Sequence, residues 1–563
     1  MEDHAVSPGG HPGEFTPIAV ITPRHRMEIL GAILLALLLV ALDQTIIGVA
    51  LPRIVASLHG TEFYTWTITI YLLTSTITVP FWGKLSDIYG RRTPLMAGIT
   101  IFLVGSALCG LSQEMWQLVL FRGIQGIGAG ALFPIALAVI GDLFSPAERG
   151  KYQGLFAAVF GFAALIGPLA GGLLTDAFSW HAIFYVNIPV GLVSLVVIWR
   201  VMPSLRRDGV THSLDFLGAA VFTAAVAPFL IGLTNGQSAD LLTPEVGGLI
   251  ALGLVIFLIF LLVERRATEP IIPLDLFKGR AYSASIAAVF LASFGFFSAI
   301  VFLPLYFQVV EGNSALESGY LMYPLLIGLM IGSIGSGQIV ARTGRYKALT
   351  LISLALVAIG SFLMTNLQAD TEYAILAIWM LILGLGIGPT LAVFTIVIQN
   401  AVPMDKLGSA TSSMTFFRQI GGSIGLAVAG TFFGSRIVTN IGTQITAAGV
   451  PPQFASQFGG NFDRNSLGAG VDLAAALKTA IAAAPIPDVL KESALGLVPA
   501  IVDAIHQAMA ITIGEVFWLG VIAMILAIGA AVLIPELPLR AHARERGAVA
   551  ETELVAAPAV DAM

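Results

Sequence analysis

The sequence predicts an all-α membrane protein with fourteen spans, built as two six-helix bundles with two additional transmembrane helices. Three observations predict it: an apolar composition, fourteen long apolar runs, and loop motifs that repeat along the chain. Of the 563 residues, 57% are hydrophobic and only 11% are charged, less than half the roughly 25% that is typical of soluble domains. Such a chain cannot cover a soluble surface with charge, which excludes ordinary soluble enzymes, nucleic-acid-binding proteins and disordered proteins.

Each apolar run has about the 20 residues that a helix needs to cross a bilayer. The polar residues 1–27 lack the pattern of a cleaved signal, so we expect the first span to be retained. The predicted spans lie at residues 28–50, 63–83, 94–111, 115–141, 152–175, 182–202, 213–235, 245–263, 282–310, 318–341, 347–366, 372–400, 407–433 and 508–534.

The positive charges of the loops predict the orientation. Of the 28 Lys and Arg residues, 21 fall in alternate segments starting with the N-terminal one, five fall on the opposite side, and Arg122 and Arg418 lie within spans. This asymmetry predicts an even number of spans in the cell (inner) membrane, with both termini in the cytoplasm.

Two loop motifs occur twice. GKLSDIYGRR at 83–92 is echoed by GQIVARTGRY at 337–346, and SPAERG at 145–150 is echoed by VPMDKLG at 402–408. Their spacing exceeds six spans, and two extra spans account for the surplus. Duplicated halves around a shared site are the plan of a secondary transporter. The predicted segments are a cytoplasmic tail at 1–27, an N-terminal six-helix bundle at 28–203, two extra helices with linkers at 204–280, a C-terminal six-helix bundle at 281–534 and a cytoplasmic tail at 535–563.

An extracellular loop at 434–507 is expected within the second bundle. It is rich in Ala, Gly and Pro, which is typical of a flexible insert. Stretches such as 470–484 can instead form short helices against the membrane surface.

Two ionisable residues inside spans are candidates for proton coupling, because each charge at a helix centre costs about 2.5 to 3.5 kcal/mol on insertion. Asp43 lies in LDQTIIGVALPRI, with no positive residue near it in the span. A carboxyl group in an apolar cavity can bind and release protons near neutral pH, although Asp43 can also be purely structural. Arg122 can respond to the protonation of Asp43, or it can hold backbone carbonyls and Gln125.

A central substrate cavity is expected between the halves, lined by apolar and aromatic side chains. Arg418 is a second buried cation, which can also serve packing with Gln419. Glu515 lies near the outer end of the last span, where it can attract a cationic substrate or simply reach water. The candidate cavity residues are Tyr71, Gln125, Phe294, Arg418 and Glu515.

The short loop after the second span predicts a cytoplasmic gate. Asp87 and Arg91 lie in that loop and Asp142 ends the fourth span on the same side. Salt bridges among them can latch the two halves together, and Gly83 and Gly90 set the turn. The alternative is ordinary anchoring of positive charge at the cytoplasmic surface.

The fifth span contains GFAALIGPLAGG, which predicts a bent helix that can approach its neighbours closely. Such a helix can act as a hinge, or the bend can be a passive kink. The candidate hinge residues are Gly161, Gly167, Pro168, Gly171 and Gly172.

Sites of other chemistry are not predicted. Cys109 is the single cysteine, so the sequence gives no disulfide framework and no cysteine-based metal site. GGSIG at 421–425 spells a nucleophile elbow, but it lies within an apolar span rather than between a strand and a helix. No phosphate-binding loop motif occurs. We therefore expect no enzyme activity, no cofactor and no metal, with the proton gradient as the energy source.

The motifs together resemble the major facilitator superfamily, and within it the 14-span drug:proton antiporters that are similar to QacA and EmrB. The resemblance rests on GKLSDIYGRR and its degraded copy, RGIQGIGAG, GFAALIGPLAGG, SWHAIFYVNIPVG and QNAVPMDKLGSATSSMTFFRQIGGSIG. It implies a major facilitator fold, Asp43 on the proton path and Arg122 in proton coupling. It also implies a gate at Asp87, Arg91 and Asp142 and an antiporter hinge at Gly167 and Pro168.

The predicted function is a proton-coupled exporter of hydrophobic or amphipathic compounds, in particular multidrug efflux by alternating access. The expected partners are the lipid bilayer, small hydrophobic substrates and protons, with no nucleic acid and a monomeric state. The alternative is an exporter of an endogenous lipid or metabolite, with incidental drug extrusion. A third reading is a sensor that does not transport, or a membrane enzyme.

Overall fold

Helices make up all the regular structure that the computed structural model describes. Within the described ranges no strand occurs, and twelve helices are long and apolar enough to cross a membrane. The all-α prediction is confirmed for this part of the chain. The described residues are 22–58, 63–144, 146–203, 215–236, 242–449, 473–483 and 488–538.

Two of the fourteen predicted spans are not among these twelve. Residues 63–83 fall in α2 (Tyr64–Tyr89) and residues 152–175 fall in α5 (Pro146–Ala177). Both are helices of spanning length, and α2 is rich in Thr and Ser, which lowers its hydropathy. The count of fourteen therefore stays a prediction.

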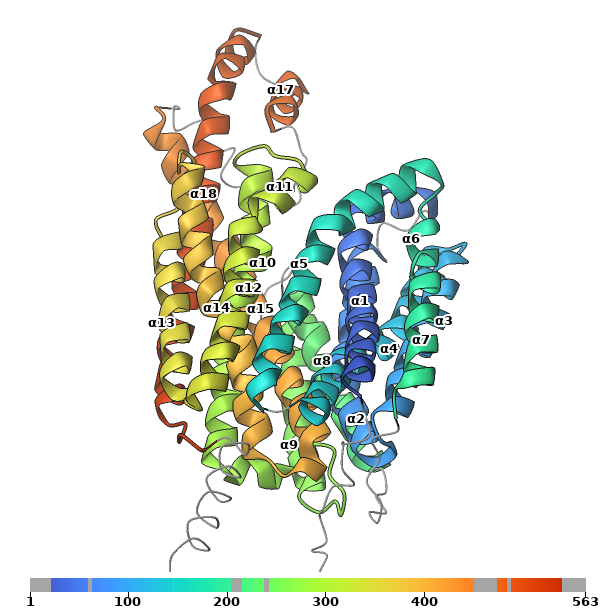
Figure 1. The fold of residues 1–563 in the computed structure, drawn as a ribbon. Helices are drawn as coiled ribbons and strands as arrows, with labels where there is room; N and C mark the ends of the chain where they lie inside the picture. The colour runs from blue at the N-terminus through green and yellow to red at the C-terminus, as the bar shows by residue number, and fades with distance from the viewer. Residues whose placement is uncertain are drawn as a thin grey trace, which may run out of the picture.

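The helices from the first part of the chain lie together on one side of the molecule (Figure 1). Helix α4 packs against α2 and α3, and α1 packs against α5 and α7. The predicted span at 182–202 is divided into two helices, α6 and α7. The other bounds are α1 (Pro23–Leu58), α3 (Arg92–Gly110), α4 (Met115–Leu143), α6 (Ala182–Tyr185) and α7 (Asn187–Val201).

The helices from the last part of the chain form the other side (Figure 1). Helix α10 packs against α15 and α18, and α14 packs against α12 and α13. The two sides meet where α5 lies along α12 and where α2 lies along α15. The bounds are α10 (Arg280–Val309), α11 (Ala315–Leu321), α12 (Tyr323–Thr343), α13 (Lys347–Met364), α14 (Tyr373–Ala401), α15 (Leu407–Ala447) and α18 (Asp488–Val532).

The two extra helices predicted at 213–235 and 245–263 are present as α8 (Phe216–Asn235) and α9 (Leu249–Glu264). The ring of Phe222 in α8 touches Phe81 of α2 and Phe416 of α15, with centroids 5.7 and 5.1 Å apart. Helix α8 therefore bridges the two sides. The short elements around them are η3 (Pro244–Gly248), η4 (Leu274–Lys278) and η5 (Met404–Lys406).

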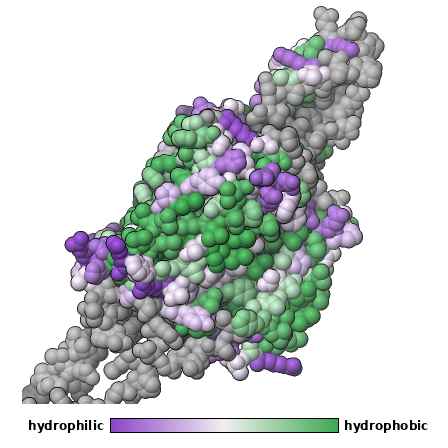
Figure 2. Space-filling view, turned by 90° about the vertical axis from the view of Figure 1, so that its right-hand side faces the viewer, coloured by the Kyte–Doolittle hydropathy of each residue, from purple (hydrophilic) through white to green (hydrophobic). Residues whose placement is uncertain are grey.

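A wide apolar surface surrounds the bundle. Large apolar side chains are exposed on helices that pack on one flank only, such as Leu258 and Leu262 of α9 and Val193 and Trp199 of α7. Figure 2 shows hydrophobic residues across the middle of one face and hydrophilic residues toward its ends. Soluble monomers do not expose apolar surface on this scale, whereas a bilayer covers it.

The described parts of the predicted loop 434–507 are mainly helical and belong to α15, α17 and α18. Helix α15 has 41 residues and α18 has 45, so each is about 60 to 70 Å long and outreaches a hydrocarbon core of about 30 Å. Helix α17 (Leu473–Ala483) lies within the stretch expected to be helical and packs against α18 (Figure 1). Residues 450–472 and 484–487 of this loop lie outside the described residues.

Candidate functional site

A buried ion pair joins helices α1 and α4. The Arg122 Nη1 atom lies 2.5 Å from the Asp43 Oδ2 atom, and the two side chains are 1% and 2% exposed. Neither residue lies in the first or last turn of its helix. The two residues that the sequence predicts for proton coupling are therefore direct neighbours, although 79 positions separate them.

Two amide side chains complete the surroundings of the Asp43 carboxylate. Gln125 Nε2 donates to Asp43 Oδ1 at 2.8 Å, and Gln125 Oε1 accepts from Arg122 Nη1 at 2.9 Å. Asn187, at the start of α7, donates to the same Oδ1 at 3.3 Å. Sequence reasoning missed Asn187, whose only signal is a polar amide at the start of an apolar run. The carboxylate thus accepts hydrogen bonds from three side chains on two helices.

The ring of Tyr71 covers the Arg122 guanidinium. Its centroid lies 4.2 Å from Arg122 Cζ, within the range of a cation–π contact. The Thr67 carbonyl oxygen accepts from Arg122 Nε at 3.4 Å. Arg122 of α4 therefore contacts α1 through Asp43 and α2 through Tyr71 and Thr67.

Helix α5 packs tightly against α1 beside this ion pair. Thr45 Oγ1, two positions after the carboxylate, donates to the Ala163 carbonyl oxygen at 3.1 Å. A Cβ atom at Gly167 would overlap the Thr45 side chain, and one at Gly171 would lie 3.1 Å from the Ile46 carbonyl oxygen. The absence of side chains at these two glycines lets α5 approach α1.

The other candidate hinge residues lie elsewhere on α5. A Cβ atom at Gly161 would meet Leu326 of α12 at 3.9 Å, and one at Gly172 would meet open space. Pro168 lies inside the continuous helix α5, and its side chain is outside the described residues. The hinge role of the whole set stays a prediction.

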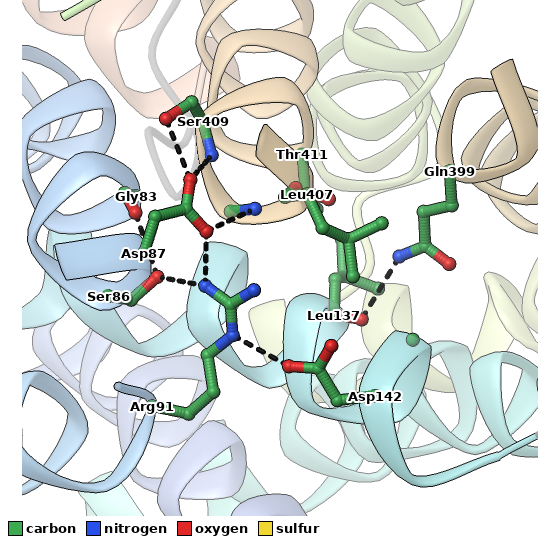
Figure 3. Close-up of polar contacts among 12 residues, drawn as sticks. Gly83, Ser86, Asp87, Arg91, Leu137, Asp142, Gln399, Leu407, Ser409 and Thr411 are labelled. Carbon is green, nitrogen blue, oxygen red and sulfur yellow. Dashed lines mark hydrogen bonds and ion pairs between the residues drawn. The ribbon is translucent and has the colours of Figure 1, made fainter. Parts of the chain in front are cut away.

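The start of α15 meets the end of α2 at what we call the gate end, the end of the bundle that contains Asp87, Arg91 and Asp142 (Figure 3). Asp87 Oδ1 accepts from the Gly408 backbone N–H at 2.8 Å, and its Oδ2 accepts from the Ser409 backbone N–H at 2.7 Å and from Ser409 Oγ at 2.8 Å. The first backbone N–H groups of a helix have no partner within it, and they carry the positive end of the helix dipole. Asp87 therefore caps a helix of the opposite side.

Both ion pairs of Arg91 lie within the first group of helices, so among Asp87, Arg91 and Asp142 no salt bridge joins the halves. Arg91 Nη1 lies 2.6 Å from Asp87 Oδ1, and Arg91 Nε lies 2.7 Å from Asp142 Oδ2. Burial lowers the pKa of Arg91, but the charges of Asp142 and Asp87 outweigh burial and raise that pKa above its ordinary value. Arg91 thus holds Asp87 in place while Asp87 makes the contact between the halves.

Two further contacts lie at the gate end. Gln399 Nε2 of α14 donates to the Leu137 carbonyl oxygen of α4 at 3.1 Å, and sequence reasoning missed it (Figure 3). A Cβ atom at Gly83 would lie 2.8 Å from the Gly408 carbonyl oxygen and would overlap Ser412. Gly90 has φ 79° and ψ 168°, a conformation that is essentially restricted to glycine. These two glycines permit the close contact and the turn that follows it.

The remaining candidate cavity residues do not lie at one place. Phe294 of α10 packs against Gly425 of α15. Arg418 lies nearer the gate end of α15 and lines a small cavity. Glu515 of α18 forms a bidentate ion pair with Arg436, with both N–O distances 2.8 Å.

The Glu515 pair predicts a small effect on transport. The side chains of Glu515 and Arg436 are 24% and 44% exposed, and an ion pair this exposed contributes little to stability because the solvent screens it. Since Arg436 already neutralises Glu515, we expect Glu515→Gln to leave ethidium export within about twofold of wild type and to lower Tm only slightly. An assay in liposomes with a melting curve checks both. A loss of ethidium export with an unchanged Tm would assign Glu515 to cation recognition instead.

The described residues contain no group of three or more His, Cys, Asp or Glu side chains that could hold a metal ion.

Known proteins are similar to this chain in sequence and in fold. The family model of the Major Facilitator Superfamily matches residues 33–426. The multidrug transporter protein MdtP of Bacillus subtilis (strain 168) is 36% identical over 515 residues, covering 90% of this chain and 92% of that protein. The tetracenomycin C resistance and export protein of Streptomyces glaucescens is 33% identical over 410 residues, covering 72% and 76%.

A solved structure of the proton:xylose symporter XylE, bound to 6-bromo-6-deoxy-D-glucose, has a TM-score of 0.55 and 13% identity, and covers 92% of this chain and 98% of that one. At this identity the likeness concerns the fold alone. The superfamily match covers well over half of the chain, and the sequence relatives are named for multidrug transport and for drug resistance and export. The chain therefore belongs to the Major Facilitator Superfamily of membrane transporters, in its drug-efflux group.

Proposed function

We propose that this chain is a proton-coupled antiporter that exports hydrophobic or amphipathic compounds by alternating access. The observation that carries the proposal is the buried Asp43–Arg122 pair, with its 2.5 Å contact in an otherwise apolar bundle. A buried pair of this kind is costly to desolvate, and intramembrane carboxylates of transporters commonly relay protons. The names of the relatives support drug efflux as the transport direction.

The proposed topology has fourteen spans, with α2 and α5 crossing the membrane beside the twelve apolar helices. The gate end then faces the cytoplasm, together with both termini, in the cell membrane. In this orientation the Asp87 cap on α15 closes the cytoplasmic side, and the structure corresponds to a state that is shut toward the cell interior.

The proposed cycle couples two events. A proton from outside binds Asp43 and releases Arg122, so that α1 and the closely packed α5 shift relative to α4. That shift withdraws α2 from the start of α15, and the cytoplasmic side opens to admit substrate. Release of the proton to the cytoplasm restores the ion pair and the cap, and the substrate leaves outward.

Proton flux in liposomes tests this function. The full chain is reconstituted with a pH-sensitive dye inside, and transport is followed for ethidium, N-dansyl-phenylalanine and its methyl ester, which are a cation, an anion and a neutral compound. We expect uphill movement of at least one of them with protons moving in the opposite direction, and we expect nigericin plus valinomycin to stop both. Uphill transport that continues after the gradients collapse contradicts proton coupling.

A further inference from the structure

Arg418 is a buried cation without an acidic neighbour. The residue is 9% exposed, and its Nη2 atom contacts the Met414 sulfur at 3.8 Å. Among the residues that the structure describes, no ion pair involves Arg418. The sequences of α10, α14 and α15, which surround it, contain no Asp or Glu at all. In contrast, Arg122 has Asp43 as its counter-ion.

A cavity adjoins this guanidinium. It is lined by Arg418 of α15, by Ser293 and Phe296 of α10 and by Thr390 of α14, among others. In this structure its volume of about 10 Å³ admits only one group of the size of a water molecule, so a larger ligand enters when the helices around Arg418 move apart in the proposed cycle. The hydroxyl groups of Ser293 and Thr390 donate to carbonyl oxygens of their own helices, so the N–H groups of Arg418 are the hydrogen-bond donors that the cavity lining offers to a ligand.

The position of Arg418 along α15 argues against a lipid headgroup as the natural ligand. The residue lies eleven positions after the start of α15 at Leu407, which places it about 16 Å from the gate end. That depth is about half of a hydrocarbon core of about 30 Å. In the proposed topology this depth fits a transported compound better than a headgroup at the membrane surface.

We propose that Arg418 is the recognition site for the acidic group of an amphipathic substrate, a carboxylate or another oxyanion, whose apolar part lies against Phe296 and the neighbouring apolar side chains. A planar guanidinium offers paired N–H donors that match a carboxylate. The inference rests on the proposed export function and adds a substrate class to it. Organic anions with an apolar ring are then the preferred cargo.

Binding of a matched pair of probes tests the proposal on the full chain in detergent. The probes are N-dansyl-phenylalanine and its methyl ester, which differ in the charge of one group. We expect wild type to bind the acid more tightly than the ester. We expect Arg418→Gln to weaken acid binding about ten- to hundredfold and to change ester binding less than about threefold. Arg418→Lys keeps the charge and should retain part of the preference.

The control variant is Arg436→Gln, which removes a positive charge from the same helix at the exposed pair. It should leave the preference for the acid intact. The Tm of Arg418→Gln should equal or exceed that of wild type, because an unpaired buried charge is removed. Equal loss of acid and ester binding in that variant, or wild-type binding of the ester as tight as of the acid, overturns the proposal. Binding of the probes in detergent requires no proton gradient, so this result is independent of the proton-flux test.

Discussion

Asp43→Asn is expected to reduce gradient-driven export to the background of empty liposomes. Asparagine has nearly the shape of aspartate but binds no proton in this pH range, so the variant has no group at this position that can load and release one. The loss should extend to substrate-induced proton movement, measured with the pH-sensitive dye inside the liposomes. Asp43→Asn also leaves Arg122 buried without its counter-ion, which costs about 3 to 5 kcal/mol of stability.

A double variant separates coupling from stability. Asp43→Asn with Arg122→Gln removes both charges, and a buried pair replaced as a whole costs far less than a broken one. We expect the double variant to regain most of the Tm that the single variant loses, while gradient-driven export stays absent. Recovery of uphill export together with the Tm would mean that the carboxylate serves only to neutralise Arg122.

Gly83→Val is expected to prevent the gate end from closing. The added Cβ would lie 2.8 Å from the Gly408 carbonyl oxygen, which is backbone and cannot turn aside as a side chain can. Overpacking of this kind costs about 1 to 3 kcal/mol, which corresponds to about a tenfold shift or more away from the closed gate at the middle of that range. Export should fall by a similar factor, because every cycle passes through the closed state.

Spin labels measure the shift directly. Cysteines placed at Tyr89 of α2 and at Asp405 next to α15 carry the labels, since both positions are exposed and the native Cys109 is buried. The distance between the labels should lengthen in Gly83→Val. Gly335→Val is the matched control, because a Cβ atom at Gly335 meets nothing within 4 Å, and its distance should equal that of wild type. An unchanged distance in Gly83→Val would refute the contact as a gate.

The class of the protein could be predicted from the sequence, but for the contact between the halves only the residues on one side could be predicted. Apolar runs identified the long helices, including the two extra helices α8 and α9. This works because hydropathy is a property of each segment and does not depend on which other segment it packs against. The gate prediction found Asp87 and Arg91 but assumed that a salt bridge joins the halves. The donors that Asp87 binds across the halves are the backbone N–H groups of Gly408 and Ser409. Every residue except proline possesses such a group, so the sequence does not indicate this contact.

Partners of the buried charges were decided by the tertiary structure. Asp43 and Arg122 are each costly within a span, so the sequence identifies both as functional candidates, but only the packing of α1 on α4 brings them to 2.5 Å. The packing of α15 on α18 places Arg436 beside Glu515, and the packing of α15 on α10 and α14 leaves Arg418 beside a cavity. What the sequence determined by itself is which segments are apolar and where charge interrupts them. Which faces meet depends on close approach at positions such as Gly83 and Gly167, and this three-dimensional fit decides which charges are paired.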